Sequence, residues 1–305
     1  MRKTFIATLL DEARRDPSIM LLTGDLGFNV IEEFAEELPS QFLNCGVAEQ
    51  SMIGVAAGLA ASGRRVFVYS IANFPTFRCL EQIRNDVAYH RHNVTIVSVG
   101  AGFAYGFDGY SHFGLEDLAV MRAIPEIDVI CPADPLETEL ITRMILKNDG
   151  PSYLRLRKEG EEIFHAEAPQ FSGGDAIRLR SGADLTIAAT GTVVSLALEA
   201  HDRLADMGIN VEVLSVPFLR PLSPDCVKAS IGRGLVTVEE HSVNGGLGSA
   251  VLDAVIACGE VPHLRKVGTP AATPSDIGES GYMWQSAGLT TEAVIEAVQS
   301  LLKPS

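Results

Sequence analysis

The sequence lacks the features that mark several common classes of protein. Its 24 basic residues are outnumbered by 39 acidic ones, which gives a net charge of −15. Because binding to nucleic acid depends on a basic surface, this balance argues against a nucleic-acid partner. No apolar run is long enough to span a membrane, so we expect no membrane partner. The N-terminal apolar stretch stops at Leu10, and this predicts an amphipathic helix rather than a signal peptide.

Cysteine is scarce as well. The chain has five cysteines, and none forms a C-x-x-C pair. They lie far apart, at Cys45, Cys79, Cys131, Cys226 and Cys258. An odd and scattered set argues against both a disulfide framework and a structural zinc site. We therefore expect a protein of a reducing, cytoplasmic compartment.

What the chain does have is an alternation of strands and helices along its whole length. Its 305 residues, 47% of them hydrophobic, are enough for about two domains. Such alternation predicts an α/β fold of two doubly wound domains, with largely parallel sheets and helices on both faces. We expect the domains at 1–160 and 181–305, with a polar linker that contains Gly and Pro at 161–180.

The apolar patterning assigns each expected element to a range of residues. Strands are expected at 20–23, 42–44, 65–70, 93–100, 127–131, 152–157, 184–190, 210–216, 234–239 and 263–267. Helices are expected at 3–15, 28–38, 77–91, 115–123, 135–147, 192–207, 223–231, 244–258 and 290–302, besides a central one.

The central helix is expected within residues 43–63, L-N-C-G-V-A-E-Q-S-M-I-G-V-A-A-G-L-A-A-S-G, where fourteen uncharged residues follow Glu49. Small side chains let other backbone come close, so we expect this helix to be buried on several sides and to end at Gly63. Glu49 then lies near the first turn, beside apolar surface. Such a carboxylate either interacts with the helix dipole or contacts a ligand nitrogen and passes a proton, and the pattern leaves both open.

The same motif strongly resembles the pyrimidine-binding domain of transketolase and of 1-deoxy-D-xylulose-5-phosphate synthase. The resemblance implies that 1–160 is this domain, that 181–305 is the transketolase C-terminal domain, and that the cofactor is thiamine diphosphate. In that family the Glu of the motif hydrogen-bonds a ring nitrogen of the aminopyrimidine and so promotes loss of the thiazolium proton. By resemblance, Glu49 is a catalytic and cofactor-binding residue.

A glycine-rich loop, F-A-Y-G-F-D-G-Y-S-H-F-G, follows the expected strand at 93–100. Ligands of open α/β sheets bind beyond the carboxyl ends of strands, so the loop is either a site or a flexible surface segment. It is similar to the D-G-x-T-H element of transketolases, with Ser111 in place of Thr. This similarity implies that Asp108 orients hydroxyls of the donor sugar and that His112 stabilises or protonates the developing alkoxide.

Two aromatic residues follow the expected strand at 65–70, in I-A-N-F-P-T-F-R-C-L. Such pairs usually belong to the core, but in the resembling family an aromatic ring here stacks on the aminopyrimidine. The resemblance implies this role for Phe77, with Phe74 beside it, while Leu80 stands where many transketolases have Tyr.

The segment T-G-D-L-G-F-N resembles the first strand-to-loop segment of the family. Asp25 is expected to reach the cofactor and Asn29 the substrate, unless the segment is only a capped turn.

Two arginines lie at the end of a strand, in G-P-S-Y-L-R-L-R-K-E-G. Arginine binds phosphate in a bidentate way, and members of the family use one near here for the substrate phosphate. The spacing does not distinguish Arg155 from Arg157, so both are candidates, and solvated charge is the alternative.

The segment V-E-E-H-S-V-N-G-G-L-G-S-A resembles the C-terminal domain of the family. We expect its glycines to serve packing, and we assign no role to His241.

One motif of the family is missing. Whole transketolases are about twice this length, and their amino-terminal domain carries G-D-G, which holds the Mg²⁺ that clamps the cofactor diphosphate. Here G-D continues with Leu at 24–26 and with Ala at 174–176. We therefore expect no metal ligands in this chain. We expect a separate N-terminal transketolase subunit that supplies them, in an α2β2 assembly.

The leading hypothesis is the C-terminal subunit of a split transketolase, which moves a two-carbon ketol unit from a ketose to an aldose and works only with its partner. Three alternatives stay open. One is a decarboxylating subunit like deoxyxylulose-phosphate synthase, another is the beta subunit of a 2-oxo acid dehydrogenase, and the third is a non-catalytic stabilising subunit. The substrates are expected to be small sugars, and the sequence does not say whether they are phosphorylated.

Overall fold

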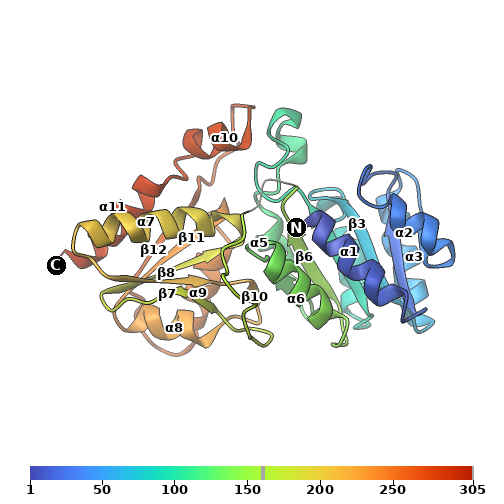
Figure 1. Ribbon diagram of the computed structural model, residues 1–305, viewed down its shortest axis with the longest axis horizontal. Helices are drawn as coiled ribbons and strands as arrows, with labels where there is room; N and C mark the ends of the chain where they lie inside the picture. The colour runs from blue at the N-terminus through green and yellow to red at the C-terminus, as the bar shows by residue number, and fades with distance from the viewer. Residues whose placement is uncertain (159–161, 304–305) are drawn as a thin grey trace.

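The computed structural model describes residues 1–158 and 162–303. Two halves lie side by side along the molecule, the first in blue to green and the second in yellow to red (Figure 1). Each half is built on one sheet, and among the described residues these sheets have seven and five strands. The domain boundary predicted at residue 160 lies outside the described residues.

The first sheet has the strand order β10-β5-β6-β4-β3-β1-β2. Its strands are β1 (Ile19–Thr23), β2 (Phe42–Asn44), β3 (Arg65–Ile71), β4 (Val94–Val99), β5 (Asp128–Ile130), β6 (Ser152–Leu156) and β10 (Phe218–Arg220). Neighbouring strands are parallel, except that β10 runs antiparallel to β5. Because β10 comes from the second half of the chain, the second half completes the first sheet.

Helices cover both faces of this sheet, as the sequence predicted. They are α1 (Arg2–Ala13), α2 (Glu32–Glu37), α3 (Glu49–Ala61), α4 (Leu80–Gln82), α5 (Asp117–Ala123) and α6 (Pro135–Ile145). Successive residues of a strand point to opposite faces. Leu21 accordingly packs in the cluster formed with α1 and α6, and Leu22 in the cluster formed with α3 and α5.

The second half repeats the plan on a smaller sheet, in the order β12-β11-β8-β9-β7. Its strands are β7 (Ile177–Arg180), β8 (Leu185–Thr190), β9 (Val211–Ser215), β11 (Leu235–Ser242) and β12 (Leu264–Thr269). Its helices are α7 (Val194–Asp206), α8 (Pro224–Ile231), α9 (Leu247–Ala257), α10 (Ser280–Ser286) and α11 (Thr291–Leu302). Across residues 1–158 and 162–303, no helix combines the length and the apolar character needed to cross a bilayer.

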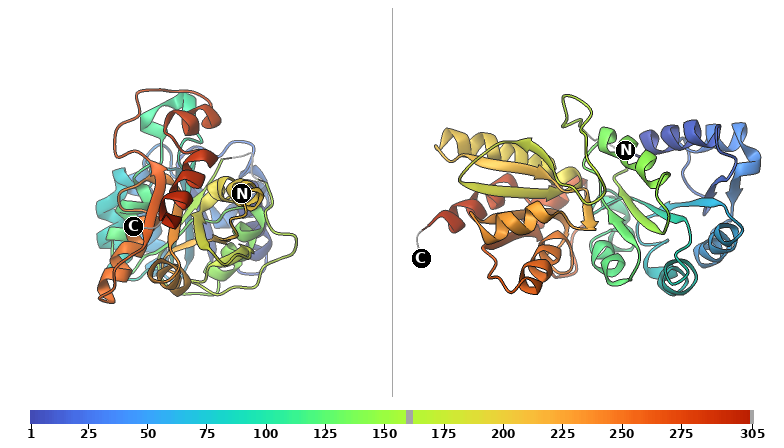
Figure 2. Two further views of the ribbon diagram at one scale, coloured as in Figure 1. Left: turned by 90° about the vertical axis from the view of Figure 1, so that its left-hand side faces the viewer. Right: turned by 90° about the horizontal axis from the view of Figure 1, so that it is seen from below.

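The two halves are packed against each other. One apolar cluster contains Leu118 and Ile124 of the first half and also Ala188, Leu219 and Leu247 of the second. The view from below in Figure 2 shows the yellow and orange elements of the second half against the green end of the first. The shared cluster therefore fixes the second sheet against the carboxyl-terminal part of the first domain.

Two helices differ from the sequence prediction. The segment expected as one helix at 77–91 consists of a 3-10 turn at Phe77–Cys79, then α4, then a π-helix at Ile83–Ala88. The helix expected at 28–38 begins only at Glu32. The reason for the late start is that Asn29 has a φ of +63°, which does not fit a right-handed helix.

Three short elements were not predicted, namely β7, β10 and α10. The sequence of β7, I-R-L-R, alternates apolar and basic residues inside the expected linker, and it pairs antiparallel with β9. Residues 177–180 therefore belong to the second sheet. The register of β10 shifts within its three residues, so it is too short to give an alternating signal.

The central helix α3 is less buried than its composition predicted. Its inner face is buried, including Met52 and Ile53. On the outer face Val55 is 42% exposed, and a Cβ on Gly54 or Gly58 would have no atom within 4 Å. Burial on several sides is therefore wrong for the chain taken alone, because one face of α3 is open.

Candidate active site

The residues that the motifs singled out gather at one edge of the first sheet. Asp25 follows β1, Phe74 follows β3, the loop at 103–113 follows β4, and Arg157 follows β6. These strands are parallel, so their carboxyl ends meet at the same edge. Ligands of open α/β sheets bind at this edge, which is therefore the candidate active site.

Glu49 is the first residue of α3 and is buried, with only 3% of its surface exposed. Its Oε2 accepts a hydrogen bond of 2.7 Å from Nη1 of Arg78, a side chain that is half exposed. The buried carboxylate thus has the partner that burying a charge requires. Sequence reasoning did not single out Arg78, because this pair joins the start of α3 to a turn after β3.

Phe74 connects Arg78 to His112. The guanidinium of Arg78 lies over the Phe74 ring, 4.7 Å from its centre. On another side the His112 ring meets Phe74 edge-on, with ring centres 5.2 Å apart. Phe77 begins the neighbouring 3-10 turn and is 37% exposed. Phe74 therefore lies within the contacts of the site, and Phe77 is the more accessible of the two rings.

His112 lies among polar and aromatic neighbours in its loop. Its Nδ1 lies 3.0 Å from Ser111 Oγ, and Asn73 Nδ2 donates a hydrogen bond to the Ser111 carbonyl at 3.2 Å. The centre of the Tyr105 ring is 6.0 Å from that of His112. Asp108 ends a 3-10 turn in the same loop and is exposed. The loop thus presents an imidazole near Phe74 and a carboxylate to solvent.

Lys158 is a cation that the sequence reasoning missed. Its Nζ lies over the Tyr105 ring, 4.7 Å from the centre. Tyr105 in turn packs on Gly100, where a Cβ would come within 2.2 Å of the ring. The contact joins the end of β6 to the loop after β4, so only the folded arrangement reveals it. Lys158 thereby brings a positive charge to the side chains around His112.

Asp25 and Asn29 both have left-handed backbone, with φ of 58° and 63°. The Asp25 amide donates to Asn44 Oδ1 at 3.1 Å, and Asn44 Nδ2 donates to Asp25 Oδ1 at 3.0 Å. The Asn29 amide donates to Glu32 Oε1 at 2.7 Å, ahead of α2. The turn expected from the pattern is present here. Both side chains lie on the exposed part of the loop after β1, so they remain candidates for ligand contacts.

Arg155 does not fit the predicted role in phosphate binding. It is 2% exposed. Its Nε donates to Asp117 Oδ2 at 2.8 Å, and its Nη2 donates to the Glu240 carbonyl at 2.9 Å. A guanidinium enclosed and bonded in this way has no free pair of N–H donors with which to bind a phosphate. Sequence reasoning placed it at a strand end, but it lies inside the junction of the two halves.

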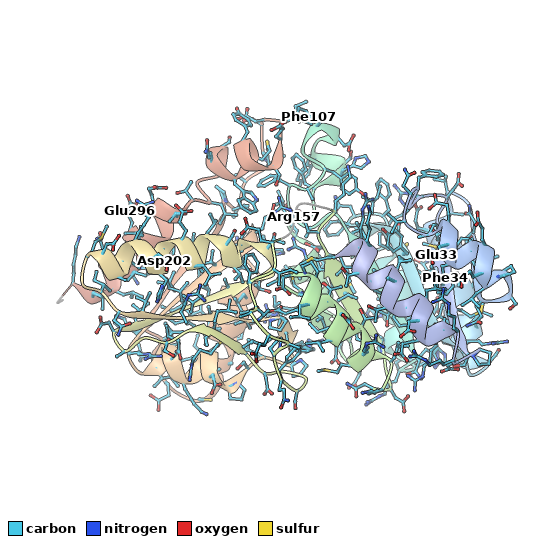
Figure 3. All side chains as sticks on the ribbon, in the orientation of Figure 1. Glu33, Phe34, Phe107, Arg157, Asp202 and Glu296 are labelled. Carbon is cyan, nitrogen blue, oxygen red and sulfur yellow. The ribbon has the colours of Figure 1, made fainter. Side chains whose placement is uncertain are left out.

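Arg157 also faces the second half of the chain. It lies between the two halves in Figure 3. Its Nη1 donates to Thr192 Oγ1 and its Nη2 to Ser280 Oγ, both at 2.9 Å. The guanidinium lies 4.9 Å from the ring centre of Trp284. Arg157 is partly exposed, so it remains a candidate, although in this structure its guanidinium contacts α10 and the 3-10 turn before α7.

His241 has a structural role at the same junction. It is fully buried, its Nδ1 lies 2.8 Å from the Ser242 carbonyl, and the Ala119 amide donates to its Nε2 at 3.3 Å. Burial lowers the pKa of His241 to about 4. The neutral ring therefore carries its proton on Nδ1 and ties β11 to α5 of the first half.

Comparison with protein families assigns both halves. Residues 1–160 match the family described as transketolase, pyrimidine binding domain, and residues 174–294 match transketolase, C-terminal domain. The first match alone covers more than half of the chain. This chain belongs to the transketolase family.

Individual relatives agree along the whole chain. An apulose-4-phosphate transketolase subunit of Phocaeicola vulgatus is 36% identical over 99% of this chain and 97% of its own length. The 6-deoxy-6-sulfo-D-fructose transketolase subunit SqwH of Clostridium sp. (strain MSTE9) is 36% identical over 99% and 94%. A solved split-gene transketolase, described as an inactive beta4 tetramer, is 35% identical over 99% and 97%, with a TM-score of 0.88.

Membership of the transketolase family implies dependence on thiamine diphosphate. The side chains at the sheet edge fit the aminopyrimidine part of that cofactor. Glu49 supplies a buried carboxylate, which Arg78 links to the Phe74 ring. A Cβ on Gly24 would lie 3.8 Å from Glu49 Oε1, so a glycine borders the carboxyl group. A carboxylate and an aromatic face are the groups that an aromatic ring with basic nitrogens would contact.

Proposed function

We propose that this chain is the C-terminal subunit of a split transketolase, which moves a two-carbon ketol unit from a ketose to an aldose. The observation that carries the proposal is Glu49, a carboxylate that is only 3% exposed and lies at the ligand-binding edge of the sheet. Arg78 contacts both Glu49 and the Phe74 ring, and His112 packs against the same ring. Relatives of the same length are named as transketolase subunits, which supports the reaction type.

Each residue of the site has a separate task in this proposal. Thiamine diphosphate, when bound, supplies a carbon nucleophile and an electron sink. Glu49 holds the pyrimidine ring nitrogen by a charge-assisted hydrogen bond, and Phe74 and Phe77 pack against the ring. His112 donates a hydrogen bond or a proton to the carbonyl oxygen of the donor sugar, and Asp108 orients its hydroxyls.

The diphosphate of the cofactor and its Mg²⁺ are assigned to a partner subunit. The sequence has no G-D-G, so this chain supplies only the pyrimidine part of the site. The open face of α3 supports such a partner, because Val55 on the helix is 42% exposed and Val47, just before the helix, is 77% exposed. Apolar side chains beside open glycines are suited to close packing of another chain. We propose an α2β2 assembly with the N-terminal transketolase subunit.

The substrates in this proposal are small sugars. Arg155 is withdrawn as a contact for a sugar phosphate, because its donors are used inside the protein. Asn29 and Arg157 remain as substrate contacts, Lys158 is added to them because its Nζ lies over the Tyr105 ring, and Asp25 remains on the cofactor side. A cytoplasmic location is part of the same proposal, and the five free cysteines support it.

The test is the Glu49→Gln variant, assembled with a partner subunit that carries G-D-G. Gln keeps the shape of the side chain but loses the charge. We expect ketol transfer to fall by about 100-fold or more while the assembly mass is unchanged. Glu36→Gln, an exposed acid on α2, is the matched control and should keep full activity. Full activity of Glu49→Gln would make Glu49 a helix-terminal charge only and would refute the proposal.

A further inference from the structure

The loop that carries His112 depends on the second half of the chain. At its base Gly102 and Gly114 exchange two backbone hydrogen bonds of 3.0 Å, so residues 103–113 leave and re-enter the fold at one point. The Ser242 amide, at the end of β11, donates to the Leu115 carbonyl at 2.8 Å. The base of the loop is therefore attached to the second sheet.

Glu240 attaches the loop base to the second half through its side chain. Its Oε1 accepts a hydrogen bond from the Phe103 amide at 2.8 Å and another from Trp284 Nε1 at 2.7 Å. The residue is 3% exposed. Gly102 has a φ of +57°, and a Cβ there would lie 2.1 Å from the Glu240 carboxyl carbon. The glycine therefore permits a close approach between the loop base and a carboxylate from the other half.

The second half also touches the tip of the loop. The Gly278 amide lies 3.3 Å from the Gly106 carbonyl, and a Cβ on Gly106 would fall 1.8 Å from the Gly278 oxygen. Figure 3 shows Phe107 at the end of this projecting loop, beside the segment that carries α10. The loop is thus in contact at both base and tip with segments from the second half.

An arginine of the first half lies beside the Glu240 carboxylate. Arg157 Nη1 lies 4.0 Å from Glu240 Oε2. The same guanidinium lies over the ring of Trp284 and donates to Ser280 Oγ. Glu240, Trp284 and Arg157 therefore form one largely buried polar group between the loop base and α10.

We propose that Glu240 is a positioning residue for His112, acting through the Phe103 amide and supported by Trp284. The inference rests on the proposed function, because it gives the loop a donor sugar to meet. A displacement of a reacting group by about 1 Å can cost about 100-fold in rate. Removing the carboxylate frees the loop base, whereas the Glu49 region lies on other elements and stays in place. The role of the second half is then to set the position of the donor-binding loop.

Three variants test this role in the assembled enzyme. We expect Glu240→Ala to lower kcat/KM for the donor by about 10- to 100-fold while thiamine diphosphate affinity stays within about twofold. Glu240→Gln keeps an oxygen that can accept from Phe103 and Trp284, so it should retain most of the activity. Trp284→Phe removes the indole N–H that donates to Glu240, so it should lower kcat/KM by a smaller factor. It replaces Glu240→Ala in the test if that variant does not fold. Unchanged donor kinetics in both Glu240→Ala and Trp284→Phe would overturn the proposal.

A second readout does not depend on turnover. Hydrogen exchange of the Phe103 amide should speed up at least tenfold in Glu240→Ala and remain slow in Glu240→Gln. Glu212→Ala is the matched control, because Glu212 is also a buried acid but binds Thr186 and Arg178 in the second sheet. It should leave Phe103 protected. Slow exchange in Glu240→Ala would refute the positioning role, whereas wild-type enzyme without ketol transfer would refute only the proposed function.

Discussion

At the scale of single residues, Glu49 has two competing partners. In this chain its Oε2 is bound by Arg78, whose guanidinium also covers the face of Phe74. The proposed function assigns the same carboxylate and the same ring to the cofactor. In that proposal, Arg78 moves off Oε2 and off this ring face when the pyrimidine binds. Because the Arg78 side chain is half exposed, this movement costs less free energy than breaking an ion pair in which both side chains are buried.

The strength of this pair can be measured in the lone chain. Arg78→Ala should lower the free energy of unfolding by about 1–2 kcal/mol, because it leaves a buried carboxylate without its donor. In a Glu49→Gln background the same change should cost about 1 kcal/mol less. Urea unfolding of the four proteins gives the coupling. Strictly additive losses would show that the two side chains do not interact.

Which site residues the sequence revealed depends on where their partners lie. Glu49 and His112 belong to continuous motifs, so the resemblance to a family was enough to propose a role for both. Arg78 and Lys158 contact side chains on other elements, and a local sequence pattern does not predict such contacts. Arg155 was misassigned for the same reason, since its partners Asp117 and Glu240 lie on α5 and β11.

At the scale of elements, α3 joins the site to the proposed subunit interface. Glu49 begins the helix, and its outer face, with Gly54 and Gly58, is open. Glycines destabilise an exposed helix, so their presence on an open face has no benefit for the lone chain. Their benefit would come from a partner that packs closely against them.

Gly54→Leu tests this interface. A Cβ at Gly54 meets no atom within 4 Å, so the lone chain should fold normally, with stability unchanged or raised by up to about 1 kcal/mol. Affinity for the N-terminal subunit should fall at least tenfold because the added side chain fills the contact. Ala205→Leu, on the exposed surface of α7, is the control and should assemble normally. Equal affinities for both variants, measured by sedimentation, would place the interface elsewhere.

The elements that sequence patterns predicted best are the long, buried ones. β4 and α7 have strong periodic signals, and the structure has both close to the expected bounds. The short edge strands β7 and β10 give weak signals, because each depends on pairing with a strand distant in the sequence. The π-helix at Ile83–Ala88 keeps an apolar spacing close to that of an α-helix, so a pattern search does not separate the two.

At the scale of the whole molecule, the two halves are joined by buried polar groups as well as by apolar packing. His241 accepts from the Ala119 amide of α5, and Arg155 binds Asp117 and Glu240. Buried groups of this kind resist a change of protonation, because the charged form of an enclosed histidine is poorly solvated. The junction should therefore be sensitive to acid.

His241→Gln should reveal this sensitivity. Burial lowers the pKa of His241 to about 4, below the unfolded value of about 6.5, so its stabilising effect is complete above pH 6.5 and is lost as the pH falls toward 4. Between pH 7 and pH 5 the wild type should lose about 2 kcal/mol relative to the variant. Glu239, whose pKa burial raises to about 7, lies 3.8 Å from His241 Nδ1, so both proteins are compared in a Glu239→Gln background, where this carboxyl group does not titrate. Parallel pH profiles of unfolding would contradict the assignment.

The measurement that tests the central claim most directly is the binding of thiamine diphosphate with Mg²⁺, by calorimetry, to this chain alone and then to its mixture with a G-D-G subunit. The split site predicts negligible heat with the lone chain and tight, saturable binding once the subunits are mixed. Tight binding to the lone chain would contradict it, because the chain would then contain a complete diphosphate site. Absence of binding in the mixture would contradict the assignment of Glu49 and Phe74 to the cofactor.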